Sequence, residues 1–154
     1  MENRNKINIK NKRAYFDYEI LEKMTAGMVL TGTEVKSIRA GKVSMGDAYC
    51  FIREGEIFIK SLQIAEYKFG NIFNHSPERE RKLLLEKKEI KRLERKTRET
   101  GNTLIPLRIY FSATGYAKIE IALAKGKKQY DKRESIKQKD AKRQMDRLHK
   151  FKER

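Results

Sequence analysis

The stretch Thr103-Leu-Ile-Pro-Leu-Arg-Ile-Tyr-Phe111, followed closely by Tyr116–Ala124, decides the fold. Both segments alternate apolar and polar residues with the period of two that is typical of β-strands. Only the short turn Ser112–Gly115 separates them, so they are expected to form an antiparallel hairpin. Pro106 lacks a backbone N–H, which places its strand at an edge or predicts a bulge there. The faces expected to point inward carry Ile105, Leu107, Ile109 and Phe111 on the first strand and Ile119, Ile121 and Leu123 on the second, with Lys118, Glu120 and Ala122 outward.

A long strand is expected near the start of the chain. Tyr15–Glu22 alternates in the same way, and Met28–Leu30 resumes the pattern after Gly27. This predicts one long strand that is bent or bulged at the glycine.

A second hairpin is expected in the middle of the chain. Ala48–Arg53 and Glu56–Leu62 both alternate, and the pair Glu54-Gly55 between them is a typical hairpin turn. The total is five or six antiparallel strands. A closed or nearly closed small β-barrel of OB type fits this count and removes exposed sheet edges, so the fold class is mainly β, with two or three flanking helices.

Two helices are expected between the strands. Thr33–Gly41 has Thr33 as its N-cap and Gly41 as its end, and its outer face carries Lys36, Arg39 and Lys42. A second helix runs over residues 86–100 and ends at Gly101; before it, residues 76–85 either start this helix or remain extended. Its exposed face is crowded with basic residues, which are Lys87, Lys88, Lys91, Arg92, Arg95 and Lys96.

Charge divides the chain into a body and a tail. The 37 Lys and Arg against 21 Asp and Glu give a net charge of +16, and residues 125–154 hold 13 against 5, which is half of that excess. So few apolar residues follow Ala124 that the segment cannot offset its ordering entropy. We therefore expect a flexible arm over residues 1–13, an OB-like RNA-binding barrel over 14–130, and a basic tail over 131–154 that is disordered when free and helical only when bound.

The composition favours an RNA-binding protein of the cytoplasm. A basic body and a basic tail both indicate a polyanionic partner, and the basic residues are interleaved with Gly, Tyr and Asp rather than set on an apolar amphipathic face, which favours RNA over a membrane. No apolar run approaches the ~18 residues of a membrane span. The N-terminal residues lack the apolar core of a signal peptide. Cys50 is a single cysteine, so it forms no disulfide or metal framework and is expected in the core.

Catalysis is not expected. His75 and His149 are the only histidines, and no metal, P-loop or nucleophile motif is present, so we expect no enzyme activity, no cofactor and no metal. The alternative is a Mg²⁺-dependent nuclease, whose ligands would be Asp17, Glu19, Glu34 and Asp47.

The start of the tail has the residues that RNA binding needs. Gly126 lets the backbone approach a ribose-phosphate closely, and Tyr130 is either a stacking platform for an unpaired base or a residue packed on the barrel rim. Further on, Ala141, Met145 and Leu148 recur at helical spacing.

Five motifs together resemble the SmpB family, the bacterial SsrA-binding proteins. In chain order they are Asn11-Lys-Arg-Ala-Tyr-Phe16, Gly32-Thr-Glu-Val-Lys-Ser-Ile-Arg-Ala-Gly-Lys42, Arg81-Lys-Leu-Leu-Leu85 with Glu89-Ile90, Gly101-Asn-Thr-Leu-Ile-Pro-Leu107, and Ala124-Lys-Gly-Lys-Lys-Gln-Tyr-Asp-Lys-Arg133. The resemblance implies an OB-like barrel that binds the tRNA-like domain of transfer-messenger RNA (tmRNA). It also implies action in trans-translation beside alanyl-tRNA synthetase and the elongation factor Tu, with the tail probing the vacant mRNA channel of a stalled ribosome. We expect a monomer.

The resemblance and the basic faces together give two sets of expected RNA contacts. One departure concerns Thr25, where most relatives have a glutamate that faces tmRNA. A structural ribosomal protein remains an alternative, because a basic barrel with a basic tail suits it equally well. The residues expected to contact tmRNA are Lys36, Arg39, Lys42, Arg81, Lys82, Leu84, Lys118, Lys125, Lys127 and Lys128, and those expected at the small-subunit decoding centre and in the mRNA channel are Tyr130, Lys132, Arg133, Lys137, Lys142, Arg143, Met145 and Leu148.

Overall fold

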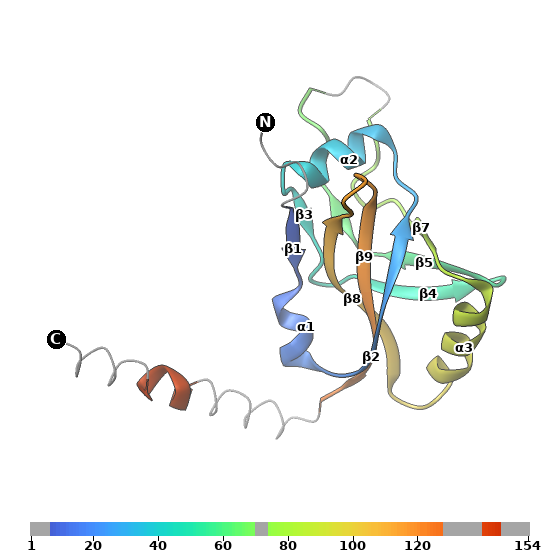
Figure 1. The fold of residues 1–154 in the computed structure, drawn as a ribbon, viewed down its shortest axis with the longest axis vertical. Coiled ribbons are helices and arrows are strands. Elements are labelled where there is room, and N and C mark those ends of the chain that lie inside the picture. The colour runs from blue at the N-terminus through green and yellow to red at the C-terminus, as the bar shows by residue number, and fades with distance from the viewer. Residues whose placement is uncertain (1–6, 70–73, 128–139, 146–154) are drawn as a thin grey trace.

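The computed structural model describes residues 7–69, 74–127 and 140–145, and every structural statement below refers to these ranges. Its main feature is a ring of six antiparallel strands (Figure 1), in which β8 pairs with β9 and so closes the sheet. In the order of the ring the strands are β8 (Asn102–Phe111), β4 (Tyr49–Arg53), β5 (Glu56–Lys60), β7 (Arg81–Leu84), β2 (Tyr18–Met28) and β9 (Ala117–Gly126). The expected OB-like barrel is confirmed.

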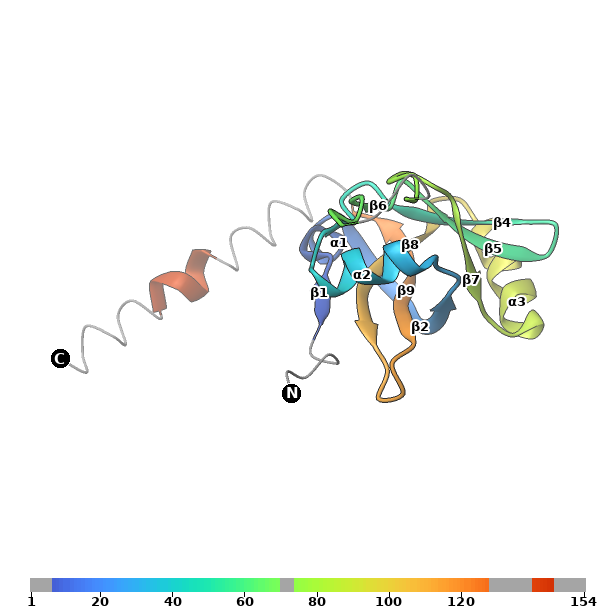
Figure 2. The ribbon, with the colours of Figure 1, turned by 90° about the horizontal axis from the view of Figure 1, so that it is seen from above.

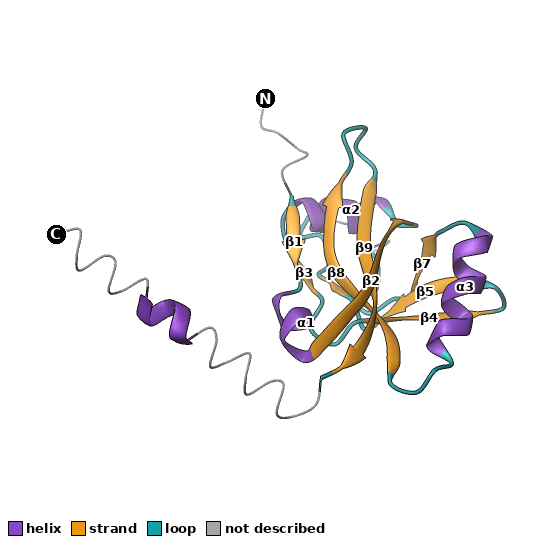
Figure 3. Ribbon diagram, turned by 60° about the horizontal axis from the view of Figure 1, so that its bottom comes forward, coloured by secondary structure: helices purple, strands orange, loops and turns teal. Residues whose placement is uncertain are grey.

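Short elements surround the ring. The strand β1 (Asn8–Lys10) pairs with β8, and a separate two-stranded sheet joins β3 (Val43–Ser44) to β6 (Gln63–Ile64). Figure 2 shows α2 (Gly32–Arg39) across one end of the barrel. Figure 3 shows α1 (Lys12–Asp17) and α3 (Lys87–Thr97) on opposite sides of the strands, toward the other end.

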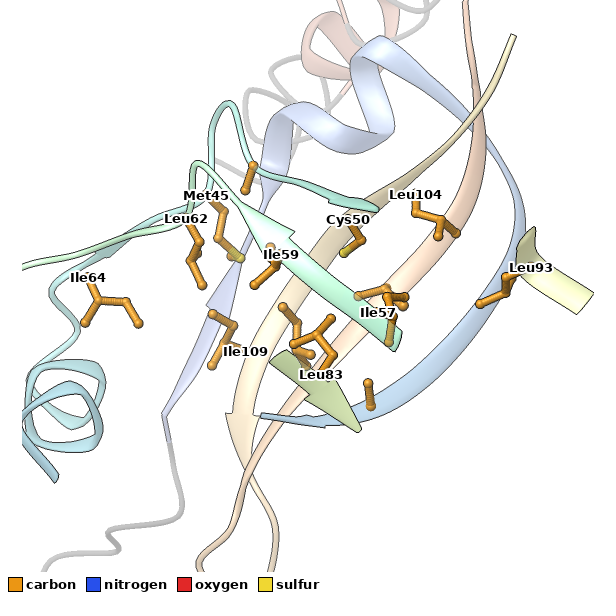
Figure 4. Packing of buried hydrophobic residues seen from close by; sticks show 14 of the residues in the cluster. Met45, Cys50, Ile57, Ile59, Leu62, Ile64, Leu83, Leu93, Leu104 and Ile109 are labelled. Carbon is orange, nitrogen blue, oxygen red and sulfur yellow. The ribbon is translucent and has the colours of Figure 1, made fainter. Parts of the chain in front are cut away.

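The core has two parts, on the two faces of the sheet. Inside the ring, Ile57, Ile59, Leu83 and Ile109 point toward one another (Figure 4). Leu93 brings α3 into the same cluster, and Cys50 is buried there as expected. Outside the ring, α1 covers a smaller cluster made of Ala14, Ile105, Leu107, Ala122 and Ala124.

The bulge predicted at Pro106 is present, but it changes which residues share a face. The register of β8 with β9 shifts between Pro106 and Arg108. As a result Ile105 lies with Leu107 under α1, whereas Ile109 and Phe111 face the barrel interior with the β9 residues expected there. The expectation of one common face was therefore wrong, because an extra residue in a strand reverses the alternation beyond it.

The N-terminal segment is more ordered than expected. Lys12–Asp17 is a helix and Asn8–Lys10 is a strand, so the flexible arm predicted over residues 1–13 is wrong from residue 8 onward. The helix lets Ala14 bury against the outer cluster, and the Asn11 side chain donates to the Pro106 carbonyl at 2.9 Å. The irregularity of β2 lies between Ile20 and Glu22 rather than at Gly27, where the pairing is regular.

The ends of α2 explain its position. Thr31, not the predicted Thr33, is the N-cap, because its side chain accepts from the Glu34 N–H while the Glu34 carboxylate accepts from the Thr31 N–H. Thr33 bonds His75 Nδ1 instead, at 2.8 Å. At the other end Gly41, with a φ of 75°, closes a Schellman motif in which Lys42 N–H donates to the Ser37 carbonyl.

Residues 76–85 contain a turn at Pro77-Glu78 and then the strand β7, which settles that alternative against a helix. The helix that follows ends at Thr97 rather than Thr100, with Arg98 as its C-cap. The hairpin through Glu54-Gly55 is confirmed.

Candidate nucleic-acid interface

One row of residues crosses the outer face of the barrel. Leu84 of β7 pairs with Gly27 of β2, Gly27 pairs with Lys118 of β9, and Lys118 pairs with Tyr110 of β8. Paired residues in antiparallel strands point to the same side of the sheet. Ile119 and Leu83 face the core, so this row faces outward. We call Leu84, Gly27, Lys118 and Tyr110 the outer row.

Gly27 keeps the centre of the outer row open. A Cβ at this position would lie 3.3 Å from the Cβ of Leu84, which is a tight contact. Leu84 is 53% exposed even though it is a large apolar side chain. The structure thus brings the two residues that the family resemblance singled out, Leu84 and Lys118, to either side of a single glycine.

A second row lies beside the first. Thr25 pairs with Glu120, and Glu120 pairs with Arg108. Arg108 Nε donates to Glu120 Oε2 at 3.1 Å, and the guanidinium lies 4.2 Å from the centre of the Tyr110 ring. Arg108, Tyr110 and Glu120 were not predicted from the sequence as RNA contacts. Their alternation with the inward-facing Ile109 and Ile119 in the hairpin is the pattern that places them on the outer face.

The basic residues of α2 lie at the end of the barrel that this helix covers. Lys36, Arg39 and Lys42 are exposed. Lys36 Nζ lies 5.3 Å from the Tyr67 ring centre, and the Arg39 guanidinium lies 5.1 Å from that of Phe111. These cations therefore form a separate patch beside aromatic rings, next to the β8–β9 turn.

Arg81 does not belong to the surface. Its side chain is 0% exposed, and its guanidinium donates to Glu34 and to the carbonyls of Leu62 and Arg79. Burial lowers the pKa of Arg81, and the Glu34 carboxylate opposes that shift. A group without accessible atoms cannot contact an RNA, so the assignment of Arg81 to the interface is wrong; it holds β7 to α2 instead.

Glu34 is the anion that balances this arginine. Its carboxylate also accepts from Arg79 Nη2 at 2.5 Å. Burial would raise the pKa of Glu34, but hydrogen bonds from Arg79, the Thr31 backbone and Arg81 outweigh that effect and hold the pKa below its usual value. Glu34 is thus occupied, which removes one ligand of the nuclease alternative. Among the described residues, no three His, Cys, Asp or Glu side chains form a group that could hold a metal ion.

The other predicted lysines of the body are spread around the barrel. Lys82 Nζ donates to Glu56 at 3.0 Å beside the outer row. Lys125 is exposed and packs along Gly101, and Lys127 Nζ donates to the Tyr15 carbonyl of α1 at 3.0 Å. On α3, Arg92 and Lys96 both bond Glu22, so part of its basic face ties the helix to β2.

The tail is described only over residues 140–145. This segment is helical and exposed and contains Lys142, Arg143 and Met145, which is 60% exposed. The remaining residues expected at the ribosome lie outside the described residues; they are Tyr130, Lys132, Arg133, Lys137 and Leu148. Lys128, which was expected to contact tmRNA, also lies outside them.

None of the helices in the described part of the chain is long and apolar enough to cross a membrane.

The fold and the exposed face define the class as a small OB-type β-barrel with a basic, partly aromatic surface. The family model described as SmpB protein matches residues 8–151. This chain belongs to the SmpB family.

Relatives and a solved structure agree with this assignment. The SsrA-binding protein of Phocaeicola vulgatus is 58% identical over 94% of this chain and 96% of its own length. That of Bacteroides thetaiotaomicron is 54% identical over the same shares. A solved chain described as "tmRNA-SmpB: a journey to the center of the bacterial ribosome" superposes with a TM-score of 0.69 at 46% identity, covering 84% of this chain and 94% of that one.

Proposed function

We propose that this protein is a non-enzymatic adaptor that binds the tRNA-like domain of tmRNA and promotes its delivery to stalled ribosomes in the cytoplasm. The relatives are SsrA-binding proteins, and the similar solved chain comes from a tmRNA–SmpB complex of the bacterial ribosome. The observation that carries the proposal is the outer row, where an exposed leucine and a lysine flank a glycine on one face of the barrel.

The outer row suits a folded RNA. Lys118 is partly exposed and reaches a phosphate, while Leu84 packs against a sugar or an unstacked base. The glycine between them leaves room for the RNA backbone to approach the sheet. Further phosphate contacts come from Lys36, Arg39, Lys42, Lys82, Lys125, Lys127 and Lys128.

The tail performs the second half of the function. Tyr130, Lys132 and Arg133 lie at the decoding centre of the small subunit, and Lys137, Lys142, Arg143, Met145 and Leu148 enter the mRNA channel when it is empty. The protein acts as a monomer beside alanyl-tRNA synthetase and the elongation factor Tu. The charge of the tail supports this part of the proposal, because a segment so basic binds a channel lined with RNA phosphates.

Lys118→Glu tests the RNA-binding face. The change places a negative charge in the outer row, so affinity for a transcript of the tRNA-like domain should fall by about 1–3 kcal/mol at fixed salt. Filter binding measures the affinity of each variant for this transcript. The matched control is Lys91→Glu, which makes the same charge change on the exposed face of α3 and should weaken binding much less. Equal losses in the two variants would mean that net charge, not the outer row, determines binding.

A further inference from the structure

A hollow of about 380 Å³ lies on the outer face, between α1, β1 and the strands of the second row. Four cations and one carboxylate line it, together with one aromatic ring. These side chains are Lys10, Lys12, Lys23, Arg108, Glu120 and Tyr15. The proposed tmRNA surface therefore continues into a concave site that the outer row does not use.

Tyr15 provides a flat apolar surface in this hollow. It is 49% exposed, and Lys23 Nζ lies 5.3 Å from the centre of its ring. An exposed ring among cations is a typical stacking platform for an unpaired base, because every base has an apolar face and the cations attract its phosphates.

Glu120 is the group that phosphate binding does not explain. A carboxylate in a cationic hollow repels a phosphate. Its side chain is only 18% exposed, and Arg108 fixes it through Oε2 at 3.1 Å. Arg108 is itself held against Tyr110. The second oxygen, Oε1, accepts no hydrogen bond from any other described residue.

A fixed carboxylate accepts hydrogen bonds from donors. Among the RNA bases, guanine presents two adjacent donors on its Watson–Crick edge, N1–H and the N2 amino group. Adenine, cytosine and uracil each present one donor on that edge. Glu120 is thus suited to guanine, and only when the base is unpaired, because pairing would occupy the same edge.

We propose that this hollow takes one unpaired guanine of the bound RNA, stacked on Tyr15, read by Glu120 and held through its flanking phosphates by Lys10, Lys12 and Lys23. The proposal rests on the proposed function, since the hollow adjoins the surface assigned to tmRNA.

The test uses the full-length protein and fluorescein-labelled RNA heptamers in which one guanosine, inosine or adenosine is flanked by three uridines on each side. Inosine keeps N1–H but lacks the N2 amino group, so it removes one of the two donors. Fluorescence anisotropy should show binding about tenfold tighter for guanosine than for adenosine, with inosine in between. Glu120→Gln should abolish this preference.

Glu94→Gln is the matched control, because Glu94 is also paired with an arginine, Arg98, but lies on α3. It should leave the guanosine preference unchanged. Tyr15→Leu should weaken binding of all three heptamers and Tyr15→Phe should not, since stacking needs the ring and not the hydroxyl.

Equal affinity for the three heptamers, or no binding of any of them, would overturn the guanine site. A guanosine preference that survives in Glu120→Gln would overturn the role of Glu120. Binding of the wild-type protein to a transcript of the tRNA-like domain tests the proposed function separately. If the transcript binds but the heptamers show no guanosine preference, only the guanine site is refuted.

Discussion

At the scale of single residues, Gly27 has the clearest consequence for function. It separates Leu84 from Lys118, and a side chain there would press on Leu84. Gly27→Val should fill this gap and weaken binding to the tRNA-like domain at least tenfold, with little change in melting temperature because the site is on the outer face. Isothermal titration calorimetry and circular dichroism measure the two quantities.

Gly46→Val is the control for Gly27→Val, because a Cβ at Gly46 would meet no other atom within 4 Å and the backbone there is not left-handed. Its affinity should match that of the wild type. If Gly27→Val bound equally well, the RNA would not approach the sheet at this point.

Arg81 and Lys82 show what single-residue reasoning could and could not predict. Both are basic residues in one short motif, and both were expected at the RNA. Arg81 is two residues before the buried Leu83 and so shares its inward face, whereas Lys82 alternates outward. The alternation in the sequence was enough to predict that Arg81 points inward and Lys82 outward. The buried partner of Arg81 is Glu34, which is 47 residues away, and no local pattern indicates this pairing.

At the scale of elements, the Glu34–Arg81 pair joins α2 to β7. Glu34→Gln leaves Arg81 buried without a counter-charge, which should cost about 3–5 kcal/mol of unfolding free energy at pH 7. Because the pKa of Glu34 is lowered in the folded state, its stabilisation is fully present above the unfolded pKa and is lost as the pH falls through the lower, folded value. Wild-type stability should therefore fall more steeply on acidification than that of the variant. Urea unfolding at several pH values measures both.

The exposed pair Glu94–Arg98 provides the comparison for this element-level link. Glu94→Gln should change stability by less than about 1 kcal/mol. A similarly small loss in Glu34→Gln would show that the buried pair contributes no more than a surface one.

The hairpins were predictable from sequence because their turns and alternation are local signals. The packing of α1 was not. Residues 12–17 carry strand-like alternation at their end, yet they form a helix because Ala14 then covers Ile105 and Leu107. Those two residues are available outside the ring only because of the bulge after Pro106. The Pro106 signal located the bulge, but it did not show that the bulge would create a second cluster for a helix to cover.

At the scale of the whole molecule, the closed barrel and the tail are expected to separate two tasks. Truncation after Lys128 should leave affinity for the tRNA-like domain within about threefold of the wild type, since the outer row is intact. It should abolish tagging of nascent chains on ribosomes stalled at the end of a truncated message. Filter binding and a reconstituted tagging reaction measure the two activities.

A control for the truncation is the full chain with Lys142 and Arg143 both changed to Ala, which keeps the tail but removes two of its charges. It should show reduced tagging at unchanged affinity. Full tagging by the truncated protein would refute a sensing role for the tail, and a large loss of affinity would place the RNA-binding surface in the tail.

The two bonds that Lys127 makes to α1 give the tail a fixed origin: its backbone N–H donates to the Asp17 carbonyl, and its ammonium group donates to that of Tyr15. A helix that ran on without a break from Lys127 would take its angular phase from the body. One residue inserted after Lys127 would turn such a helix by about 100° and advance it by about 1.5 Å. For such a helix, the number of residues between Lys127 and the tail contacts would therefore matter as much as which residues make those contacts.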